Sequence, residues 1–408
     1  MSTKHPPRKT ALNDWHRAHG GRMVDFSGWE LPVHYAEGII TEHLQVRLAS
    51  GVFDVSHMGR FSIEGADAES FLDYALTNAA HTLTPGTAHY TLLATPHGGA
   101  IDDAYLYRRS ASDFLLVVNA GNREAAWAAL EERRARFQIT LSDISDQLAM
   151  IALQGPDSER VLGGVIEAGA FPGNQRNCMS EATLDGESVL VARTGYTGER
   201  CCFELFTHVE HISALWDRLV DRGAHPIGLG ARDSLRLEAS LPLYGHELGD
   251  DETGAEIPVL ASRTSLFGIR KPNQGRYVGE GPISNQRREL EQLRAGNAVR
   301  VPQHLRRLVQ PITVPDGRRP LRPGHRVRFG GREVGYVTSG TSVPFSIDAN
   351  GSPLRAGKPI MRPIGLALVE AQIQFSDHSP VMFEIADERG RSQGAALVKG
   401  NLNVHAPT

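Results

Sequence analysis

The feature that most constrains the fold of this chain is the irregular way in which short β-like runs and helices alternate. From Val52 onward, short runs typical of strands dominate, and they include residues 61–63, 89–93, 100–108 and 114–118. Helical stretches interrupt these runs, but without the regular strand–helix–strand rhythm that a parallel sheet requires. The pattern therefore predicts an α+β fold that is built largely on antiparallel sheet.

The length of the chain and its last hundred residues predict more than one domain. The chain has 408 residues, and a single hydrophobic core rarely serves so long a sequence. After residue 306, short alternating strands are separated by glycine and proline turns, as at 324–328 and 330–340, which is typical of a β-barrel or a sandwich. Before it, residues 250–281 are rich in loops, and residues 283–302 are typical of a helix or a linker.

Five further stretches have the composition and the boundaries of helices. Alanine-rich, charged or amphipathic sequences end at glycine or before proline, as helices commonly do. We expect helices over residues 39–49, 124–136, 157–162, 211–222 and 232–240.

Composition and charge exclude several classes of partner. The net charge of −4 gives no reason to expect nucleic acid or an anionic membrane. No apolar run approaches the ~20 residues that span a bilayer, and the first residues lack the apolar stretch of a secretory signal. The three cysteines, Cys178, Cys201 and Cys202, form no Cys-x-x-Cys pair and so suggest neither a zinc ribbon nor a redox motif. We therefore expect a cytoplasmic protein without a metal.

The most informative segment reads Gly-Gly-Ala-Ile-Asp-Asp-Ala-Tyr-Leu-Tyr over residues 98–107. Side chains alternate between the two faces of a strand, so Asp103, Tyr105 and Tyr107 share one face while Asp102 lies on the other. The two aspartates are therefore not expected to share an ion. One carboxylate flanked by tyrosines suits the wall of a pocket for a planar polar ligand, although a turn aspartate followed by a half-buried strand would give the same pattern.

A second segment, residues 193–199, reads Arg-Thr-Gly-Tyr-Thr-Gly-Glu and is followed by Phe203-Glu204-Leu205. The glycines predict a tight loop in which the backbone approaches something closely. Phe203 and Leu205 should face a core, and Glu204 should face away from it. A carboxylate can accept two parallel hydrogen bonds from an amidine-like edge, such as that of a pterin, but a solvated glutamate on an edge strand fits equally well.

Two charged or titratable residues leave alternatives open. Gly228 and Gly230 do not form a dinucleotide fingerprint, because the third glycine and the surrounding βαβ unit are missing. Arg232 falls in a first helical turn, where a cation is unfavourable by roughly 0.3–1 kcal/mol, so it indicates either an anionic partner or a salt bridge to Asp233 or Glu238. His57 follows an aspartate, Asp54, and is more typical of a structural hydrogen-bonding residue than of a metal ligand.

Taken together, these segments resemble the aminomethyltransferase family, the T-proteins of the glycine cleavage system. The matching motifs stand in the family's order and cover residues 10 to about 250 almost continuously. They are residues 23–32, 51–59, 85–90, the Asp102-Asp103 segment, residues 117–120, 153–156, 193–199, 228–239 and 243–247.

The resemblance implies three subdomains around a central folate channel, largely antiparallel sheet, with a C-terminal β-barrel. We expect a discontinuous folate-binding domain over residues 1–50 and 141–295. Residues 51–140 would form an inserted α+β domain, and residues 296–408 the barrel.

The resemblance also assigns roles to individual residues. Asp103 resembles the essential carboxylate near the reactive nitrogens of tetrahydrofolate. The resemblance also implies a set of cofactor-binding residues. The apolar and aromatic lining of the pocket would be Met58, Tyr90, Tyr107 and Tyr196. Asn119 and Glu204 would make polar contacts, Glu204 on the pterin edge, and Arg232 would lie at the channel. No metal is expected at this site.

The implied reaction transfers the methylene of an aminomethyl group to tetrahydrofolate and releases ammonia. The group would arrive on the dihydrolipoyl arm of H-protein, the expected partner. A nearby carboxylate can stabilise the positive charge that develops as ammonia leaves, and it can manage a proton of the folate amine.

Departures from the family pattern leave two other functions open. The match weakens at residues 250–281 and 347–359, and the family's C-terminal arginine can correspond to Arg389 or to Arg391. One alternative is a folate-dependent demethylase of a small methylated amine or sulfonium compound on the same fold. The other is a non-catalytic folate-binding protein, but that branch carries a Lys-Gly-Cys-Tyr motif, and here Arg276 stands in place of the cysteine.

Overall fold

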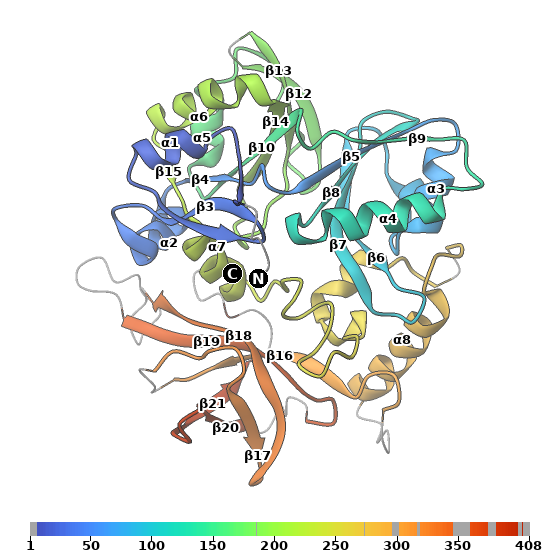
Figure 1. The fold of residues 1–408 in the computed structure, drawn as a ribbon, viewed down its shortest axis with the longest axis vertical. Coiled ribbons are helices and arrows are strands. Elements are labelled where there is room, and N and C mark those ends of the chain that lie inside the picture. Colours follow the sequence, from blue (N-terminus) through green and yellow to red (C-terminus); the bar gives the residue numbers. More distant parts are fainter. Residues whose placement is uncertain are drawn as a thin grey trace. The chain divides into compact units, whose positions relative to one another are not determined.

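The computed structural model describes residues 6–184, 186–272, 274–295, 302–315, 319–345, 360–373, 381–398 and 402. Contacts within the chain define two compact units. Figure 1 labels the helices and strands of the described residues. The first unit comprises residues 1–91 and 104–233, and the second comprises residues 92–103 and 234–408. The domain boundaries that the resemblance implies remain a prediction.

A seven-stranded sheet forms the centre of the first unit. Six of its strands pair antiparallel, and only the short last strand runs parallel to its neighbour. In spatial order the strands are β11 (Ala168–Gly169), β12 (Met179–Leu184), β13 (Glu187–Ala192), β14 (Cys202–His208), β10 (Leu148–Gln154), β4 (Gly51–Asp54) and β15 (His225–Pro226).

One face of this sheet packs against amphipathic helices to form the core of the unit. Ile151 and Leu205 are paired across β10 and β14, and both lie in a single cluster of buried apolar residues. Trp216 joins the same cluster from α6 (Ile212–Asp221), and Val161 joins it from α5 (Ser158–Gly163). Because alternate side chains of β10 and β14 point into this cluster, the side chains between them point to the other face of the sheet. That other face can carry polar side chains.

A small sheet precedes the central one in the chain. It consists of β1 (Arg8–Lys9), β3 (Trp29–His34) and β2 (Arg22–Phe26). Ser27 and Gly28 join β2 to β3 with φ values of 50° and 79°, the left-handed conformation that suits a two-residue hairpin. Two helices belong to the same region, α1 (Asn13–Ala18) and α2 (Gly38–Leu48).

A second, five-stranded sheet contains the strand predicted to carry the reacting carboxylate. Its order is β6 (Thr87–Ala94), β7 (Ala100–Arg108), β8 (Asp113–Val118), β5 (Gly59–Glu64) and β9 (Thr140–Asp143). Its helical segments are α3 (Ala68–Ala75), η1 (Ala80–Thr82), η2 (Ala120–Asn122) and α4 (Arg123–Arg133). The end of the β6–β7 hairpin, residues 92–103, is counted with the second unit.

The second unit contains a closed six-stranded barrel. Its strands are β16 (Arg307–Thr313), β19 (Ile360–Glu370), β18 (Arg332–Phe345), β17 (Arg326–Phe329), β20 (Met382–Ala386) and β21 (Ser392–Leu397). Apolar residues such as Val337, Ala367 and Phe383 fill its interior. Between hairpin and barrel in the sequence lie η4 (Val259–Ala261), η5 (Arg263–Gly268) and α8 (Glu280–Arg294), while α7 (Leu229–Glu238) begins in the first unit and ends in the second.

The predicted fold class is confirmed, including the closed barrel at the C-terminal end. The predicted strand over residues 100–108 coincides with β7, and residues 283–302 contain a helix, α8, rather than a linker alone. Two helix boundaries differ from the prediction by three residues. The helix expected at residue 232 begins at Leu229, and the one expected to reach residue 136 ends at Arg133.

Within the described residues, no helix is both long enough and apolar enough to cross a membrane.

Candidate functional site

Strand β7 shows the alternation that the sequence predicts. Asp102 is fully buried and Ala104 and Leu106 are buried with it, whereas Asp103 and Tyr105 are half-buried. The two aspartates therefore lie on opposite faces of the strand. Their predicted separation is confirmed.

A hydrogen-bonded cluster surrounds the predicted pterin ligand, Glu204. Its neighbours Phe203 and Leu205 lie in the core, so Glu204 points to the other face of β14. There the hydroxyl of Tyr107 donates to Oε2 of Glu204 at 2.6 Å, and Thr194 donates to the same oxygen. Glu204 is only 8% exposed. The interpretation of a solvated glutamate is therefore wrong, because protein side chains enclose the carboxylate.

Three tyrosines extend from this cluster along the five-stranded sheet. The ring of Tyr107 lies 5.5 Å from that of Tyr105, which lies 6.4 Å from that of Tyr90, and Phe206 closes the row 5.2 Å from Tyr107. Burial raises the pKa of Tyr107, and the adjacent carboxylate of Glu204 raises it further. Tyr107 is therefore a neutral hydroxyl donor at physiological pH.

Arg232 lies beside aromatic rings and makes no ion pair with a described residue of the first unit. Its guanidinium carbon is 5.2 Å from the centre of the Tyr196 ring and 5.9 Å from that of Phe53. Its Nη1 atom is buried without a hydrogen-bond partner. Burial lowers the pKa of Arg232, while Tyr196 and then Glu204 act to raise it.

The start of helix α7 sets the direction of Arg232. A buried carboxylate, Glu42, accepts hydrogen bonds from the backbone N–H groups of Gly228 at 2.9 Å and Tyr35 at 2.6 Å. Gly228 has no room for a side chain, because a Cβ there would lie 2.6 Å from the carbonyl of Val33. The glycines at 228 and 230 therefore serve close packing, in agreement with the rejection of a nucleotide fingerprint. Burial raises the pKa of Glu42.

The loop over residues 193–199 is as tight as its glycines predict. A Cβ at Gly195 would lie 2.5 Å from the amide nitrogen of Gln154, and that amide's oxygen accepts from Thr197 at 2.5 Å. Arg47 of α2 donates to the carbonyl of Thr197 at 2.9 Å and pairs with Glu199. The loop is thus held on both sides of Tyr196.

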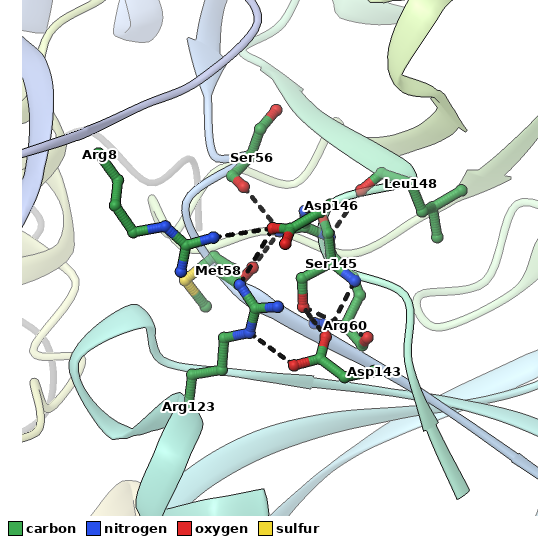
Figure 2. Close-up of polar contacts among 9 residues, drawn as sticks. All are labelled: Arg8, Ser56, Met58, Arg60, Arg123, Asp143, Ser145, Asp146 and Leu148. Atoms are coloured by element: carbon green, nitrogen blue, oxygen red, sulfur yellow. Dashed lines mark hydrogen bonds and ion pairs between the residues drawn. The ribbon is translucent and has the colours of Figure 1, made fainter.

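Met58, a predicted pocket residue, sits in a turn that a buried arginine organises. Figure 2 shows the side chain of Arg60 surrounded by backbone carbonyls. Arg60 donates to the carbonyl oxygens of Leu148 and Ser56 at 2.8 Å each, and also to those of Met58 and Ser145. Four acceptors from two distant segments therefore converge on one guanidinium, which is 1% exposed. Burial lowers the pKa of Arg60 to about 10.

A row of three ion pairs lies beside Arg60 (Figure 2). Arg123 donates to Asp143 at 2.7 Å and to Asp146 at 3.2 Å, and Arg8 donates to Asp146 at 2.9 Å. Ser145, between the two aspartates, accepts from the backbone N–H of Arg60 at 2.8 Å. The Asp143–Asp146 turn is therefore fixed by Arg8 and Arg123 on one side and by Arg60 on the other.

Asp54 and His57 do not bond to each other as neighbours in a structural pair would. Asp54 pairs with His16 at 3.1 Å and accepts a hydrogen bond from the backbone N–H of Ser56 at 2.9 Å. Burial alone would raise the pKa of Asp54, but these contacts outweigh the effect of burial and lower the pKa to about 2. His57 is buried, packs edge-on against Phe26 at 5.8 Å, and has no partner for Nδ1. Burial lowers the pKa of His57 to about 3, so its imidazole is neutral.

In the second unit, Asp103 belongs to a group of carboxylates around Tyr244. Burial raises the pKa of the Tyr244 phenol, and Asp102, Asp250, Glu256 and Asp103 raise it further, in that order. The neighbouring hairpin tip is tied down, since Thr95 donates to Glu256 at 3.0 Å.

The same hairpin tip also binds other parts of the second unit. The carbonyl of Gly98 accepts from the backbone of Val259 at 3.0 Å and from the side chain of Gln286 at 2.8 Å. The start of β7, which carries Asp103, is thus anchored to η4 and α8.

The remaining predicted residues lie as follows. Asn119 is half-buried and precedes η2. Its backbone carbonyl accepts a hydrogen bond from the backbone N–H of Asn122 at 3.0 Å. Arg391 pairs with Asp387 at 2.7 Å, and the backbone of Arg389 donates to the same carboxylate at 3.0 Å. Both arginines lie on the turn that joins β20 to β21, so the choice between them stays open.

Sequence reasoning missed several members of these clusters. Thr194 shares the Glu204 carboxylate, Arg60 shapes the Met58 turn, and Tyr244 accompanies Asp103. Thr194 and Tyr244 lie inside the motifs at residues 193–199 and 243–247. Their presence in these motifs was the signal from which a role in the site could have been predicted. Arg60 gave no signal, because all its acceptors are backbone atoms.

The comparisons with known proteins show the family to which this α+β architecture with its C-terminal barrel belongs. A family profile described as the GCVT N-terminal domain matches residues 12–260. This chain belongs to that family.

Similar proteins carry a consistent name. The aminomethyltransferase of Rubrobacter xylanophilus is 41% identical over 338 residues, which cover 83% of this chain and 84% of that protein. The aminomethyltransferase of Thermus thermophilus is 39% identical over 390 residues, covering 96% of this chain and 97% of its own. Among solved structures, the glycine cleavage system aminomethyltransferase T of Bartonella henselae is 28% identical with a TM-score of 0.77, covering 96% and 97% of the two chains.

These similarities confirm the predicted family and the prediction of an enzyme of the aminomethyltransferase type. A demethylase on the same fold is not favoured by the relatives, whose names agree with the principal prediction.

Proposed function

We propose that this enzyme transfers the methylene of an aminomethyl group to tetrahydrofolate and releases ammonia. The donor we propose is the aminomethyl group on the dihydrolipoyl arm of an H-protein. Support comes from the aminomethyltransferase names of the relatives, and from the similarity to the Bartonella henselae enzyme, which belongs to a glycine cleavage system.

The observation that carries the proposal is that the first unit contains both a carboxylate oxygen that accepts no hydrogen bond from a described residue, Oε1 of Glu204, and a buried donor without an acceptor, Nη1 of Arg232. Both hydroxyls that bind Glu204 donate to its Oε2, and no described residue donates to its Oε1. Arg232, whose pKa responds to Glu204, has a buried Nη1 without a partner. A buried guanidinium N–H left unpaired costs about 1–3 kcal/mol, so a ligand acceptor is expected there. The edge of a pterin carries both N–H donors and acceptors, and it fits this pair.

The surrounding side chains suit a flat, partly polar ligand. The half-buried rings of Tyr90 and Tyr196 supply apolar surface with polar rims, whereas Tyr107 is fully buried. We propose that Tyr90 and Tyr196, together with Met58 and Asn119, contact tetrahydrofolate, and that Tyr107 takes part in the site through its hydrogen bond to Glu204. Because Tyr107 and Thr194 already occupy Oε2 of Glu204, we expect Oε1 to accept the main hydrogen bond from the pterin.

Asp103 is the residue that we propose for the chemical step. Tetrahydrofolate supplies the nucleophilic nitrogens. Asp103 is half-buried on the tyrosine face of β7 and is anchored by the hairpin of the second unit. Its carboxylate would stabilise the positive charge that develops as ammonia departs, and it would hold a proton of the attacking amine.

Activity with alternative donors tests the reaction. We expect turnover with tetrahydrofolate and aminomethylated H-protein, and none with methylated amines or sulfonium compounds. Transfer from a small methylated donor without H-protein would overturn the proposed donor while leaving the folate site standing.

Asp103→Asn tests the catalytic role. We expect kcat to fall at least ~100-fold, with tetrahydrofolate affinity nearly unchanged, because the amide cannot carry charge or accept a proton. Asp250→Asn is the matched control, since Asp250 also influences Tyr244 but is exposed. Near-normal kcat in Asp103→Asn would exclude the role.

A further inference from the structure

Two histidines and two glutamates gather at one end of the central sheet, away from the residues assigned to folate. His208 ends β14, Glu210 and His211 follow it in η3 (Val209–His211), and Glu187 begins β13. We call these four residues the His/Glu cluster. Glu187, Glu210 and His208 are exposed or nearly so, and His211 is half-buried, so solvent ions can reach all four.

The spacing of the ligand atoms resembles that of a tetrahedral metal site. Metal–nitrogen bonds of about 2.0–2.1 Å place neighbouring tetrahedral ligands roughly 3.3 Å apart. Nε2 of His211 lies 3.4 Å from Oε2 of Glu187, and Nδ1 of His208 lies 3.7 Å from Oε2 of Glu210. Ligand atoms of His208, Glu210 and His211 all fall within 4.8 Å of one another. Small side-chain rotations would therefore close the donors of His208, Glu210 and His211 around one ion, and Glu187 lies beside His211 as a further carboxylate.

The charges in the cluster also favour a cation. Other carboxylates of this unit, such as Glu167 and Glu159, pair with arginines. Among the described residues, Glu187 and Glu210 have only histidines as ion-pair partners. The two carboxylates supply negative charge that a divalent cation would neutralise.

The backbone beneath the cluster is held by the central sheet and by the core of the first unit. His208 is paired with Leu148 in the sheet, and Ile212, the residue after His211, is fully buried in the core. His208 Nδ1 accepts the backbone N–H of Glu210 at 3.5 Å, a long hydrogen bond that an ion can replace.

We propose that the His/Glu cluster binds one divalent transition-metal ion of the zinc class. Imidazole nitrogens suit zinc, nickel and copper, whereas magnesium and calcium prefer sites made of oxygen alone. The ion joins β13, β14 and the start of α6, and thereby reinforces the end of the strand that carries Glu204. This site is independent of the folate reaction.

Zinc titration of the full, chelator-treated protein tests the proposal. We expect one zinc ion per chain to compete with a chromogenic chelator, and we expect zinc to raise the melting temperature by mass action. His208→Ala or His211→Ala should weaken binding at least ~10-fold and abolish the thermal shift, since loss of even an outer-shell partner commonly costs this much. Glu187→Gln should weaken binding less.

His81→Ala is the matched control. His81 also pairs with one carboxylate, Asp73, at 2.6 Å, but no second histidine among the described residues joins them. We expect zinc affinity in this variant to equal that of the wild type. The proposal is overturned if the wild type binds no stoichiometric zinc, or if its affinity survives loss of both His208 and His211.

Discussion

Two arginines of the first unit, Arg60 and Arg232, have opposite surroundings. Arg60 donates to four backbone carbonyls and is almost fully enclosed. Arg232 lies against two aromatic rings, and its Nη1 has no acceptor. A guanidinium whose donors are all used stabilises the fold, whereas one that is left incomplete is suited to a ligand.

The difference extends to the residues around each arginine. Arg60 fixes the turn that carries Met58, so it acts on the site only through the backbone. Arg232 lies within electrostatic reach of Glu204, the residue that we propose for the pterin edge. Substitutions should therefore separate stability from ligand affinity.

The largest expected effect is on stability, in Arg60→Met. This change leaves four carbonyls without their donor, and we expect the free energy of unfolding to fall by at least about 3 kcal/mol. Urea titration followed by circular dichroism measures it. Arg60→Lys, which keeps the charge but fewer donors, should lose an intermediate amount. A loss below about 1 kcal/mol in Arg60→Met would show that solvent replaces these bonds.

The second effect is on affinity, in Arg232→Met. We expect tetrahydrofolate to bind roughly ten- to hundredfold more weakly, because a charged hydrogen bond is worth about 1.5–3 kcal/mol. The free energy of unfolding should change by less than about 1 kcal/mol, since no ion pair is broken. Arg218→Met, which removes an exposed pair with Glu167, is the control for charge. If Arg232→Met unfolded as readily as Arg60→Met, the contrast between the two arginines would be lost.

The third effect extends the comparison to His57, which also has an unsatisfied buried nitrogen. The pKa of His57 is lowered to about 3 by burial, below the ordinary value of 6.5. Between these values the unfolded chain binds a proton that the folded chain does not, so stability falls as the pH falls through this window. The expected slope is up to about 1.4 kcal/mol per pH unit.

Comparison with His57→Asn over pH 4.5–6.5 measures the third effect. The variant should have a shallower dependence on pH, and equal slopes would contradict the assignment. Asp54 interferes little in this range, because the pKa of Asp54 is lowered from 3.8 to about 2 and its contribution is lost only at lower pH.

The smallest effect is expected in Tyr107→Phe. Glu204 would keep the Thr194 donor but lose the 2.6 Å bond from Tyr107, at a cost of about 1 kcal/mol in stability. Tetrahydrofolate should bind a few-fold more weakly, because the carboxylate is less well oriented. Tyr105→Phe loses a hydrogen bond to Asn177 instead and leaves Glu204 untouched. Isothermal titration distinguishes the two variants, and identical affinities would argue that Tyr107 does not orient the carboxylate.

Local patterns were enough to predict much of the fold and part of the site. The alternation of β7 separates Asp102 from Asp103, and the flanking apolar residues direct Glu204 away from the core. Both depend only on the period of a strand, which the sequence displays directly. The family resemblance supplied the barrel's closure, which the sequence alone left open between a barrel and a sandwich.

Contacts that involve the backbone or distant strands could not be predicted. The acceptors of Arg60 include carbonyls of residues 145 and 148, and a carbonyl has no signature in the sequence. In the His/Glu cluster, His208, Glu210 and His211 are close in sequence, but Glu187 arrives only through the pairing of β13 with β14. The role of Glu42 was missed for the same reason, since its partners are two backbone N–H groups.

The anchoring of Gly228 by Glu42 sets a limit on how this protein can vary. Arg232 follows one helical turn later, and its N–H bonds to the carbonyl of Gly228 at 3.1 Å. Each residue of an α-helix turns the chain by about 100°, so a single insertion or deletion within this turn would swing the guanidinium away from Tyr196. Loops elsewhere can change in length during evolution, but the number of residues between Gly228 and Arg232 must stay the same to keep Arg232 beside Tyr196.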